Sequence, residues 1–212
     1  MILPDKEFIE VFKKTPGALS VTESIAIMNI SNQAPSGGIW CEGGTHKGKS
    51  AMSAIYGATQ AVEFHLIDTE FEKTISTKDI STNISSITKN GVRVVFIIEQ
   101  FANYLKQSDF KYSFVFSDAG IHDDEVMEEM KLLEDKIIPN GIICMHDCGN
   151  QFTAVQRAYD YLVSTGKFEP ISIDWEPIIE YVRENDLENG NDSWHIYEEH
   201  PYPNFVGAVR RK

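Results

Sequence analysis

A glycine-rich segment that begins at Cys41 has the residue types of a cofactor loop, and its letters fit two patterns. The stretch GGTHKGKS (residues 43–50) matches a phosphate-binding loop, in which Lys49 and backbone N–H groups hold a nucleoside triphosphate. A later apolar run that ends at Asp118 loosely resembles the strand that supplies the metal-binding Asp in such proteins. Preceded by Glu42, the same glycine segment matches a loop that holds S-adenosylmethionine. The segment therefore leaves two classes of cofactor open.

Two carboxylates near the loop favour S-adenosylmethionine, whose sulfonium is positive. Glu42 would repel a triphosphate, and His46 stands where phosphate loops usually carry a further glycine. Asp68 ends the next apolar run, about 20 residues after the loop, where an acid hydrogen-bonds ribose hydroxyls in dinucleotide sites. We therefore expect an adenosyl cofactor, with His46, Lys47 and Lys49 on the exposed side of the loop. A phosphate-loop nucleotide enzyme, a kinase or an NTPase, is the alternative.

Apolar runs alternate with helical segments along the chain, which indicates a parallel sheet covered by helices on both faces. Ser20 and Glu23 have the spacing of a capping box at the start of one of these helices. Strands are expected at residues 37–42, 64–68, 92–98, 112–118 and 142–147. Helices are expected at residues 5–14, 20–30, 50–61, 77–91, 101–107, 123–137 and 153–166.

The last part of the chain departs from this alternation. Residues 169–176 and 204–211 have the pattern of two strands joined by a polar connection without a packed helix, which predicts an antiparallel pair at the sheet edge. The expected fold class is α/β: a Rossmann-like, doubly wound, mostly parallel sheet with an antiparallel C-terminal strand pair.

The chain contains no linker-like segment, so a single domain is expected over residues 1–212. It is divided into N-terminal helices (1–34), a cofactor-binding core (35–165), and C-terminal strands (166–212). An aromatic-rich stretch at residues 193–205 is expected to form either a lid over the acceptor or an oligomer contact.

The carboxyl ends of the expected strands predict a binding site, because open parallel sheets bind ligands at that edge. A purely structural sheet needs no acids there, yet nearly every strand end carries polar or acidic residues. Histidine ordinarily titrates near neutral pH, which suits a general base, and His122 and His146 are the candidates. The strand-end residues are Glu42, Asp68, Glu99, Gln100, Asp118, His146 and Asp147.

Three stretches resemble the class I S-adenosylmethionine-dependent methyltransferases: CEGGTHKGKS, FHLID and the long segment at 112–147. The similarity runs from residue 15 to residue 148 and is greatest to small O-methyltransferases of the catechol and macrocin type and to cephalosporin-hydroxylase-like proteins. It implies methyl transfer to a small-molecule acceptor, with oxygen as the expected acceptor atom. The cofactor-binding residues that it implies are Glu42, Gly43, Gly44, Thr45, Ser50, Asp68, Gln100, Phe101 and Asp118.

The resemblance also implies a divalent metal. In metal-dependent members, an acid after the fourth strand and a pair after the fifth bind the ion, and the matching positions here are Asp118, His146 and Asp147. The catechol type has a carboxylate and an amide as the pair, so His146 is a departure. Carboxylates suit magnesium, whereas an imidazole favours manganese, iron or zinc. The catalytic candidates are Asp118, His122 and His146, although the DAGIH stretch has one residue more than the family's DGxH, which would displace His122.

The composition bears on the partners and the compartment. A net charge of -13 is opposite to the positive surface that nucleic-acid binding needs. The N-terminal segment shows neither a signal-peptide nor a membrane-spanning pattern. Three cysteines without metal-type spacing suggest reduced thiols. We therefore expect a cytoplasmic protein that acts on a small molecule and not on nucleic acid or a membrane, with a homo-oligomer and a catalytically inactive binding protein left open.

Overall fold

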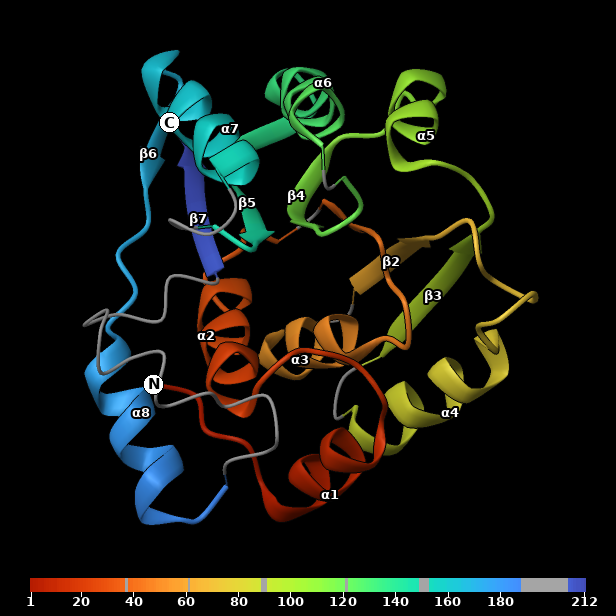
Figure 1. Ribbon diagram of the computed structural model, residues 1–212, viewed down its shortest axis with the longest axis vertical. Helices are drawn as coiled ribbons and strands as arrows, with labels where there is room; N and C mark the ends of the chain where they lie inside the picture. Colours follow the sequence, from red (N-terminus) through yellow and green to blue (C-terminus); the bar gives the residue numbers. More distant parts are fainter. Residues whose placement is uncertain (37, 61, 89–90, 121, 149–152, 188–205) are drawn as a thin grey trace.

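The computed structural model describes the chain except for residues 37, 61, 89–90, 121, 149–152 and 188–205 (Figure 1). The described strands form one seven-stranded sheet with the order β3-β2-β1-β4-β5-β7-β6. β7 (Val206–Arg211) is antiparallel to β5, and β6 (Phe168–Pro170) is antiparallel to β7, which confirms the expected fold class. The parallel strands are β1 (Ile39–Gly43), β2 (Val62–Ile67), β3 (Val92–Ile97), β4 (Tyr112–Ser117) and β5 (Ile137–His146).

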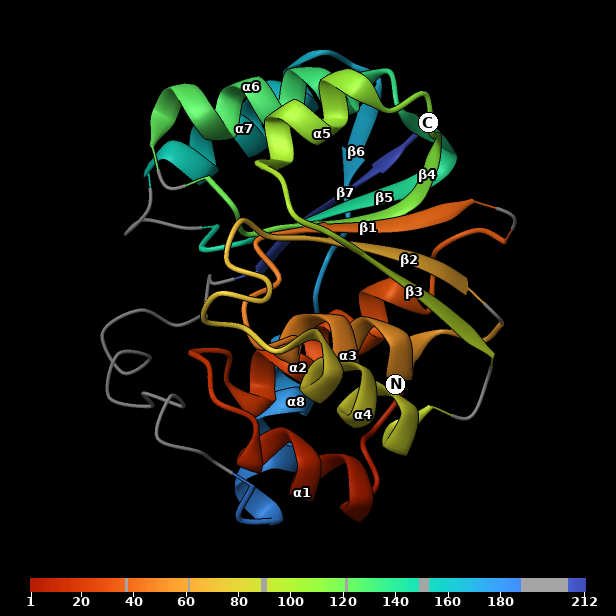
Figure 2. The ribbon, with the colours of Figure 1, turned by 90° about the vertical axis from the view of Figure 1, so that its right-hand side faces the viewer.

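Helices cover both faces of the sheet, and each face has its own apolar core (Figure 2). One face carries α5 (Phe101–Gln107), α6 (Asp123–Glu134) and α7 (Thr153–Ser164). The other face carries α2 (Val21–Ser31), α3 (Lys49–Gly57), α4 (Thr77–Ile87) and α8 (Trp175–Glu184), with α1 (Lys6–Lys14) farther out. No described helix has the length and apolar character needed to cross a bilayer.

The capping box predicted at the start of α2 is confirmed. The Ser20 hydroxyl accepts from the Glu23 backbone N–H at 3.1 Å, and the Glu23 carboxylate accepts from the Ser20 backbone N–H at 2.8 Å. α2 is buried on almost all sides because it packs against α3, α8, β5 and β7. α2 is therefore held within the core, and the capping box fixes its first turn.

The strand predicted at residues 169–176 is wrong beyond Pro170. β6 has only three residues, and α8 follows it before the chain returns as β7. Trp175, Ile178 and Val182 are buried on one side of α8, with spacings of three and four residues. This helical spacing favours a helix, although the short alternating pattern just before it had indicated a strand. The connection between the two antiparallel strands therefore includes a packed helix.

The strand expected at residues 142–147 begins earlier, since Pro139, Asn140 and Gly141 lie within β5. The pairing register shifts here: Tyr112 pairs with Ile137, whereas Phe114 pairs with Ile142. Asn140 adopts a φ of 62°, a left-handed conformation that asparagine tolerates better than most residues. The extra residues form an irregularity in the strand, and α6 ends at Glu134 instead of continuing to Ile137.

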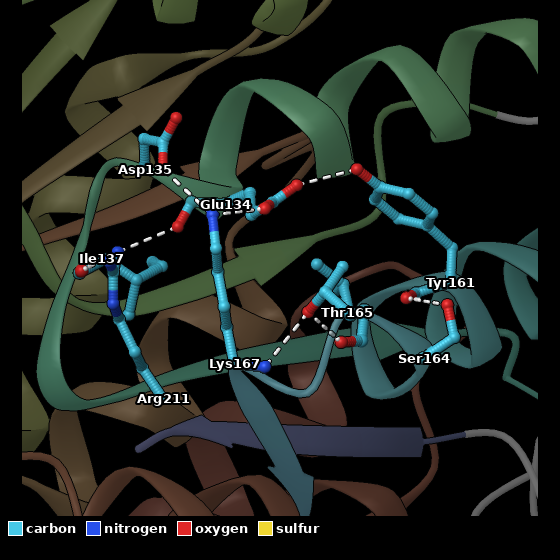
Figure 3. Close-up of polar contacts among 9 residues, drawn as sticks. Glu134, Asp135, Ile137, Tyr161, Ser164, Thr165, Lys167 and Arg211 are labelled. Atoms are coloured by element: carbon cyan, nitrogen blue, oxygen red, sulfur yellow. Dashed lines mark hydrogen bonds and ion pairs between the residues drawn. The ribbon is translucent and has the colours of Figure 1, made fainter.

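A polar cluster fixes the C-terminal strand pair to the end of α6 (Figure 3). Lys167 Nζ and Tyr161 Oη each donate to the Glu134 carboxylate at 2.6 Å. Arg211 donates from Nη1 to the backbone carbonyls of Glu134 at 2.8 Å and Ile137 at 2.7 Å. The hydrogen bond from Lys167 and, to a smaller extent, that from Tyr161 lower the pKa of Glu134. The cluster thus joins α6, α7, β6 and β7 through one carboxylate and one guanidinium.

Candidate functional site

Two glycines let the end of β1 approach its neighbours closely. Gly44 has a φ of 79°, and a Cβ there would overlap the carbonyl of Asp118 at the end of β4. A Cβ at Gly43 would overlap the ring of Phe101 at the start of α5. Gly44 N–H donates to Ile67 at 3.0 Å, and Asp118 N–H donates to Gly43 at 3.0 Å. The ends of β1, β2 and β4 therefore meet at one place.

Glu42 is fully buried below the loop, and one of its oxygens lacks a partner. Its Oε1 accepts from the Ser50 hydroxyl, whereas Oε2 has no hydrogen bond among the described residues. Burial raises the pKa of Glu42 well above its ordinary value, the Ser50 hydrogen bond partly opposes the rise, and the charges of Asp118 and Asp68 add to it. The hydroxyl of Thr45 is likewise buried without a described partner. Orphaned buried polar atoms at one loop indicate a place where a ligand supplies the partners.

Asp68 follows β2 and reaches back to the glycine loop. Its Oδ2 accepts from the His46 backbone N–H, and its Oδ1 accepts from the Glu70 backbone N–H, both at 2.8 Å. These bonds fix the carboxylate beside the loop, and each oxygen keeps a second lone pair. Asp68 is thus positioned to accept from hydroxyl groups of a ligand.

The expectation that Lys49 faces solvent is wrong. Lys49 is 7% exposed, and its Nζ lies 3.3 Å from the carbonyl oxygens of Gly17 and Leu19. The same ammonium lies 4.4 Å from the centroid of the Phe12 ring. The long side chain follows the inner side of the loop because carbonyls and an aromatic face there satisfy its charge. His46 is exposed as expected.

A cavity of about 690 Å³ lies at the carboxyl edge of the sheet. The segment at residues 16–19, which precedes α2, lines part of this cavity. Glu42, Gly43 and Asp147 are outside its described lining, and so is His122, which is exposed at the N-cap of α6. The predicted site residues that line the cavity are Gly44, Thr45, Ser50, Asp68, Gln100, Phe101, Asp118 and His146.

Asp118, His146 and Asp147 form a cluster, and two of its members, Asp118 and His146, line this cavity. His146 Nδ1 lies 3.4 Å from Asp118 Oδ1 and 3.4 Å from Asp147 Oδ1. The three side chains each offer one ligand atom, and these atoms lie within 4.8 Å of one another. Burial lowers the pKa of His146, but its hydrogen bonds with Asp118, Asp147 and Glu23 outweigh this and raise it far above the ordinary range. The cluster therefore concentrates negative charge around one imidazole.

Two buried acids near the site were not predicted to belong to it. Glu129, on α6, lines the cavity and accepts from the Ser117 hydroxyl at 3.1 Å. Burial raises the pKa of Glu129 to about 8. Glu23 accepts from His146 Nε2 at 3.2 Å, although its sequence signal was only the capping box. Because the spacing along the chain says nothing about contacts across 123 residues, only the fold could bring Glu23 to the cluster.

Comparisons with known proteins agree with this geometry. Residues 41–148, from β1 to the end of β5, match a family model described as a methyltransferase domain. A comparison with curated proteins finds no match.

Among solved structures, the fold is similar to that of an O-methyltransferase from Bacillus cereus in complex with SAH. The two are 14% identical with a TM-score of 0.59, over 100% of this chain and 93% of that one. The O-methyltransferase TomG from Streptomyces achromogenes, in complex with SAM, is 13% identical with a TM-score of 0.57, over 82% and 85% of the chains. An rRNA methylase from Streptococcus thermophilus is 10% identical with a TM-score of 0.51, over 89% and 93%.

At these identities, the solved structures establish a shared fold, and the family model establishes the family. The matched residues contain the glycine loop, Asp68 and the whole Asp118–His146–Asp147 cluster. The chain therefore belongs to this family of methyltransferase domains and has the Rossmann-like fold of the class I S-adenosylmethionine-dependent methyltransferases.

Proposed function

We propose that the protein transfers a methyl group from S-adenosylmethionine to an oxygen atom of a small-molecule acceptor, with a divalent metal at the reacting centre. One observation carries the proposal: a single cavity is lined by the glycine loop and Asp68 and also by Asp118 and His146. Residues expected to bind the cofactor and residues of the candidate reacting centre thus line the same cavity.

The loop residues fit the cofactor's chemistry. Asp68 offers lone pairs to the ribose hydroxyls, as acids at this position do in dinucleotide sites. Thr45 lines the cavity and its Oγ1 is buried without a described partner, so the ammonium of the methionine end would donate to it. Glu42 Oε2 also lacks a described partner but lies outside the lining, so it would be reached through water. Phe101, 3% exposed and next to Gln100, supplies an apolar surface near the adenine.

The cluster fits a divalent metal. Asp118 and Asp147 supply hard carboxylate oxygens, and His146 supplies an imidazole nitrogen on the same side. This donor set favours manganese or iron over magnesium. When bound, the ion would act as a Lewis acid that lowers the pKa of an acceptor hydroxyl. A cation bound among these carboxylates would also favour the neutral imidazole of His146 over its protonated form.

The protein's own residues mainly align the reactants. Methyl transfer is an in-line displacement, so holding the acceptor oxygen in line with the methyl group lowers the barrier to the reaction. We assign Asp118 to the junction between the cofactor and acceptor sides, because it follows β4 and also faces His146. His122 has no part in the proposal, since it is exposed outside the described cavity lining.

The acceptor class rests on charge and on the similar structures. A net charge of -13 and a cavity bordered by Glu99, Glu125, Glu128 and Glu129 do not suit a phosphate backbone. The similar Bacillus cereus and Streptomyces achromogenes proteins are described as O-methyltransferases. The phosphate-loop alternative is less well supported: Lys49 lines the cavity, but its ammonium is held by backbone carbonyls and by the Phe12 ring.

Isothermal titration calorimetry with S-adenosylmethionine tests the cofactor assignment. The wild type should bind in the micromolar range, and Asp68→Ala should weaken binding at least tenfold, because two hydroxyl–carboxylate hydrogen bonds are lost. Asp109→Ala removes an exposed carboxylate outside the cavity lining and should bind like the wild type. No binding by the wild type, or equal binding by Asp68→Ala, would refute the proposal.

The acceptor atom needs a separate experiment. A panel of hydroxylated and amine-bearing small molecules is incubated with cofactor that carries a ¹³C-methyl group. The methyl carbon chemical shift of any product then distinguishes an oxygen-bound from a nitrogen-bound or carbon-bound methyl. Methylated amines alone would leave the methyltransferase assignment intact and overturn the oxygen acceptor.

A further inference from the structure

Glu23 uses its two carboxylate oxygens for two different purposes. Oε2 accepts from the Ser20 backbone N–H at 2.8 Å and completes the capping box of α2. Oε1 accepts at 3.2 Å from Nε2 of His146, which is the last residue of β5 and lines the cavity. A capping box needs only one oxygen acceptor at this position, and glutamine serves as well as glutamate. The second contact is therefore an interaction that the helix cap does not require.

The contact with Glu23 determines which ring nitrogen of His146 faces Asp118 and Asp147. A carboxylate only accepts, so His146 Nε2 must carry the hydrogen. The other ring nitrogen, Nδ1, then lies 3.4 Å from both Asp118 Oδ1 and Asp147 Oδ1. If the ring turned over, a C–H group would face Glu23 and the contact would be lost. Both side chains are almost fully buried, which leaves water little access to replace the contact.

We propose that Glu23 is a positioning residue, which holds His146 through Nε2 so that Nδ1 faces the space between Asp118 and Asp147. A carboxylate behind a histidine is a recurrent way of orienting an imidazole toward a metal or a reacting group. The proposal rests on the proposed function in one respect, namely that this space is the reacting centre. Glu23 also fixes the start of α2, directly after the cavity wall at residues 16–19.

Glu23→Gln and Ser20→Ala separate the two roles of Glu23. Glutamine replaces one of the two carboxylate oxygens by an NH2 group, which only donates, so an acceptor remains at the position facing the Ser20 backbone N–H or at the one facing His146 Nε2, but not at both. Ser20→Ala removes the reciprocal bond, from Glu23 N–H to the Ser20 hydroxyl at 3.1 Å, and leaves the contact with His146 in place. Loss of this cap costs about 1 kcal/mol and therefore reports the purely structural contribution.

The hydrogen on His146 Nε2 can be observed directly by ¹⁵N-edited NMR of the imidazole side chains. A buried, hydrogen-bonded N–H exchanges slowly with water, so the wild type and Ser20→Ala should both show this resonance. Glu23→Gln should lose it. No resonance in the wild type, or the same resonance in Glu23→Gln, would overturn the proposal. A wild type without this resonance overturns the proposal even if Glu23→Gln does not fold.

Ligand binding and kinetics provide the second readout. We expect Glu23→Gln to bind Mn²⁺ at least tenfold more weakly, within the range found for loss of such orienting groups. Its kcat for methyl transfer should fall at least tenfold, while its affinity for S-adenosylmethionine stays within twofold of wild type. Equal losses in Ser20→Ala and Glu23→Gln would mean that Glu23 acts only as a cap. Failure of the proposed function would appear differently, as a wild type that does not bind S-adenosylmethionine, and the NMR result would still decide the role of Glu23.

Discussion

Lys49 Nζ lies 4.4 Å from the centroid of the Phe12 ring, so the lysine of the glycine loop is packed against the N-terminal helix α1. Its ammonium also contacts the carbonyls of Gly17 and Leu19, which belong to the cavity wall. In a phosphate loop the equivalent lysine would reach the ligand. Here it holds the N-terminal segment over the loop.

Lys49→Met should therefore reduce stability. The methionine keeps the apolar stem but loses the charge, the contacts with carbonyls and the cation–π interaction, which should lower the free energy of unfolding by about 2 kcal/mol. Urea denaturation measures the change. Lys47→Met is the control, because Lys47 makes a more exposed bond to the Thr74 carbonyl, and its effect should stay below about 1 kcal/mol. A stable Lys49→Met protein, or ATP binding by the wild type that Lys49→Met abolishes, would contradict this account.

Gly44→Ala should damage both the fold and the cofactor site. The φ of 79° costs an alanine about 1 kcal/mol, and its Cβ would in addition overlap the carbonyl of Asp118. Gly166→Ala is a matched control, since Gly166 has a φ of 72° with no atom within 4 Å of the added Cβ. Calorimetry should show weakened binding of S-adenosylmethionine for Gly44→Ala alone. Equal stability losses and unchanged binding in both variants would show that the close approach to Asp118 is unimportant.

Glu134→Gln should change how stability depends on pH. The folded-state pKa of Glu134 lies below its ordinary value of 4.5, so its ionised form stabilises the protein above about pH 4.5. This contribution is lost as the pH falls through the folded-state pKa. We expect Glu134→Gln to be about 1–3 kcal/mol less stable at pH 7, and we expect the difference to shrink in acid.

Urea denaturation between pH 3 and pH 7 measures this effect. Asp135→Asn is the control, because Asp135 is 82% exposed and lies 3.5 Å from the same Lys167 ammonium (Figure 3). Its stability curve should follow that of the wild type. A difference between wild type and Glu134→Gln that is constant with pH would show that the carboxylate charge is not what stabilises the cluster.

Removal of divalent metal tests the metal part of the proposed function. After treatment with a chelator, kcat should fall strongly, because the acceptor hydroxyl would lose the group that favours its deprotonation. Mn²⁺ should restore the activity, whereas the affinity for S-adenosylmethionine should not change. Full activity in metal-stripped protein would remove the ion from the mechanism and leave the cofactor assignment standing.

The sequence by itself determined the sheet and the position of its binding edge. Alternating apolar runs and amphipathic helices are local patterns, and a strand that ends in Asp68 or Asp118 is recognisable without any contact being known. Local patterns were weaker guides at α8, where the sequence fits both a strand and a helix, and at Asn140, where a strand continues through a residue with a left-handed backbone conformation. In these places packing decides between two locally acceptable structures.

Contacts between distant segments were decided only by the tertiary structure. Lys49 has the letters of a phosphate loop, but burial against Phe12 gives it another role. Glu23 has the letters of a helix cap, but it meets His146 only because α2 packs against β5. The physical reason is the same for both residues: spacing along the chain specifies the local backbone, whereas the partner of a buried charge depends on which elements the core brings together.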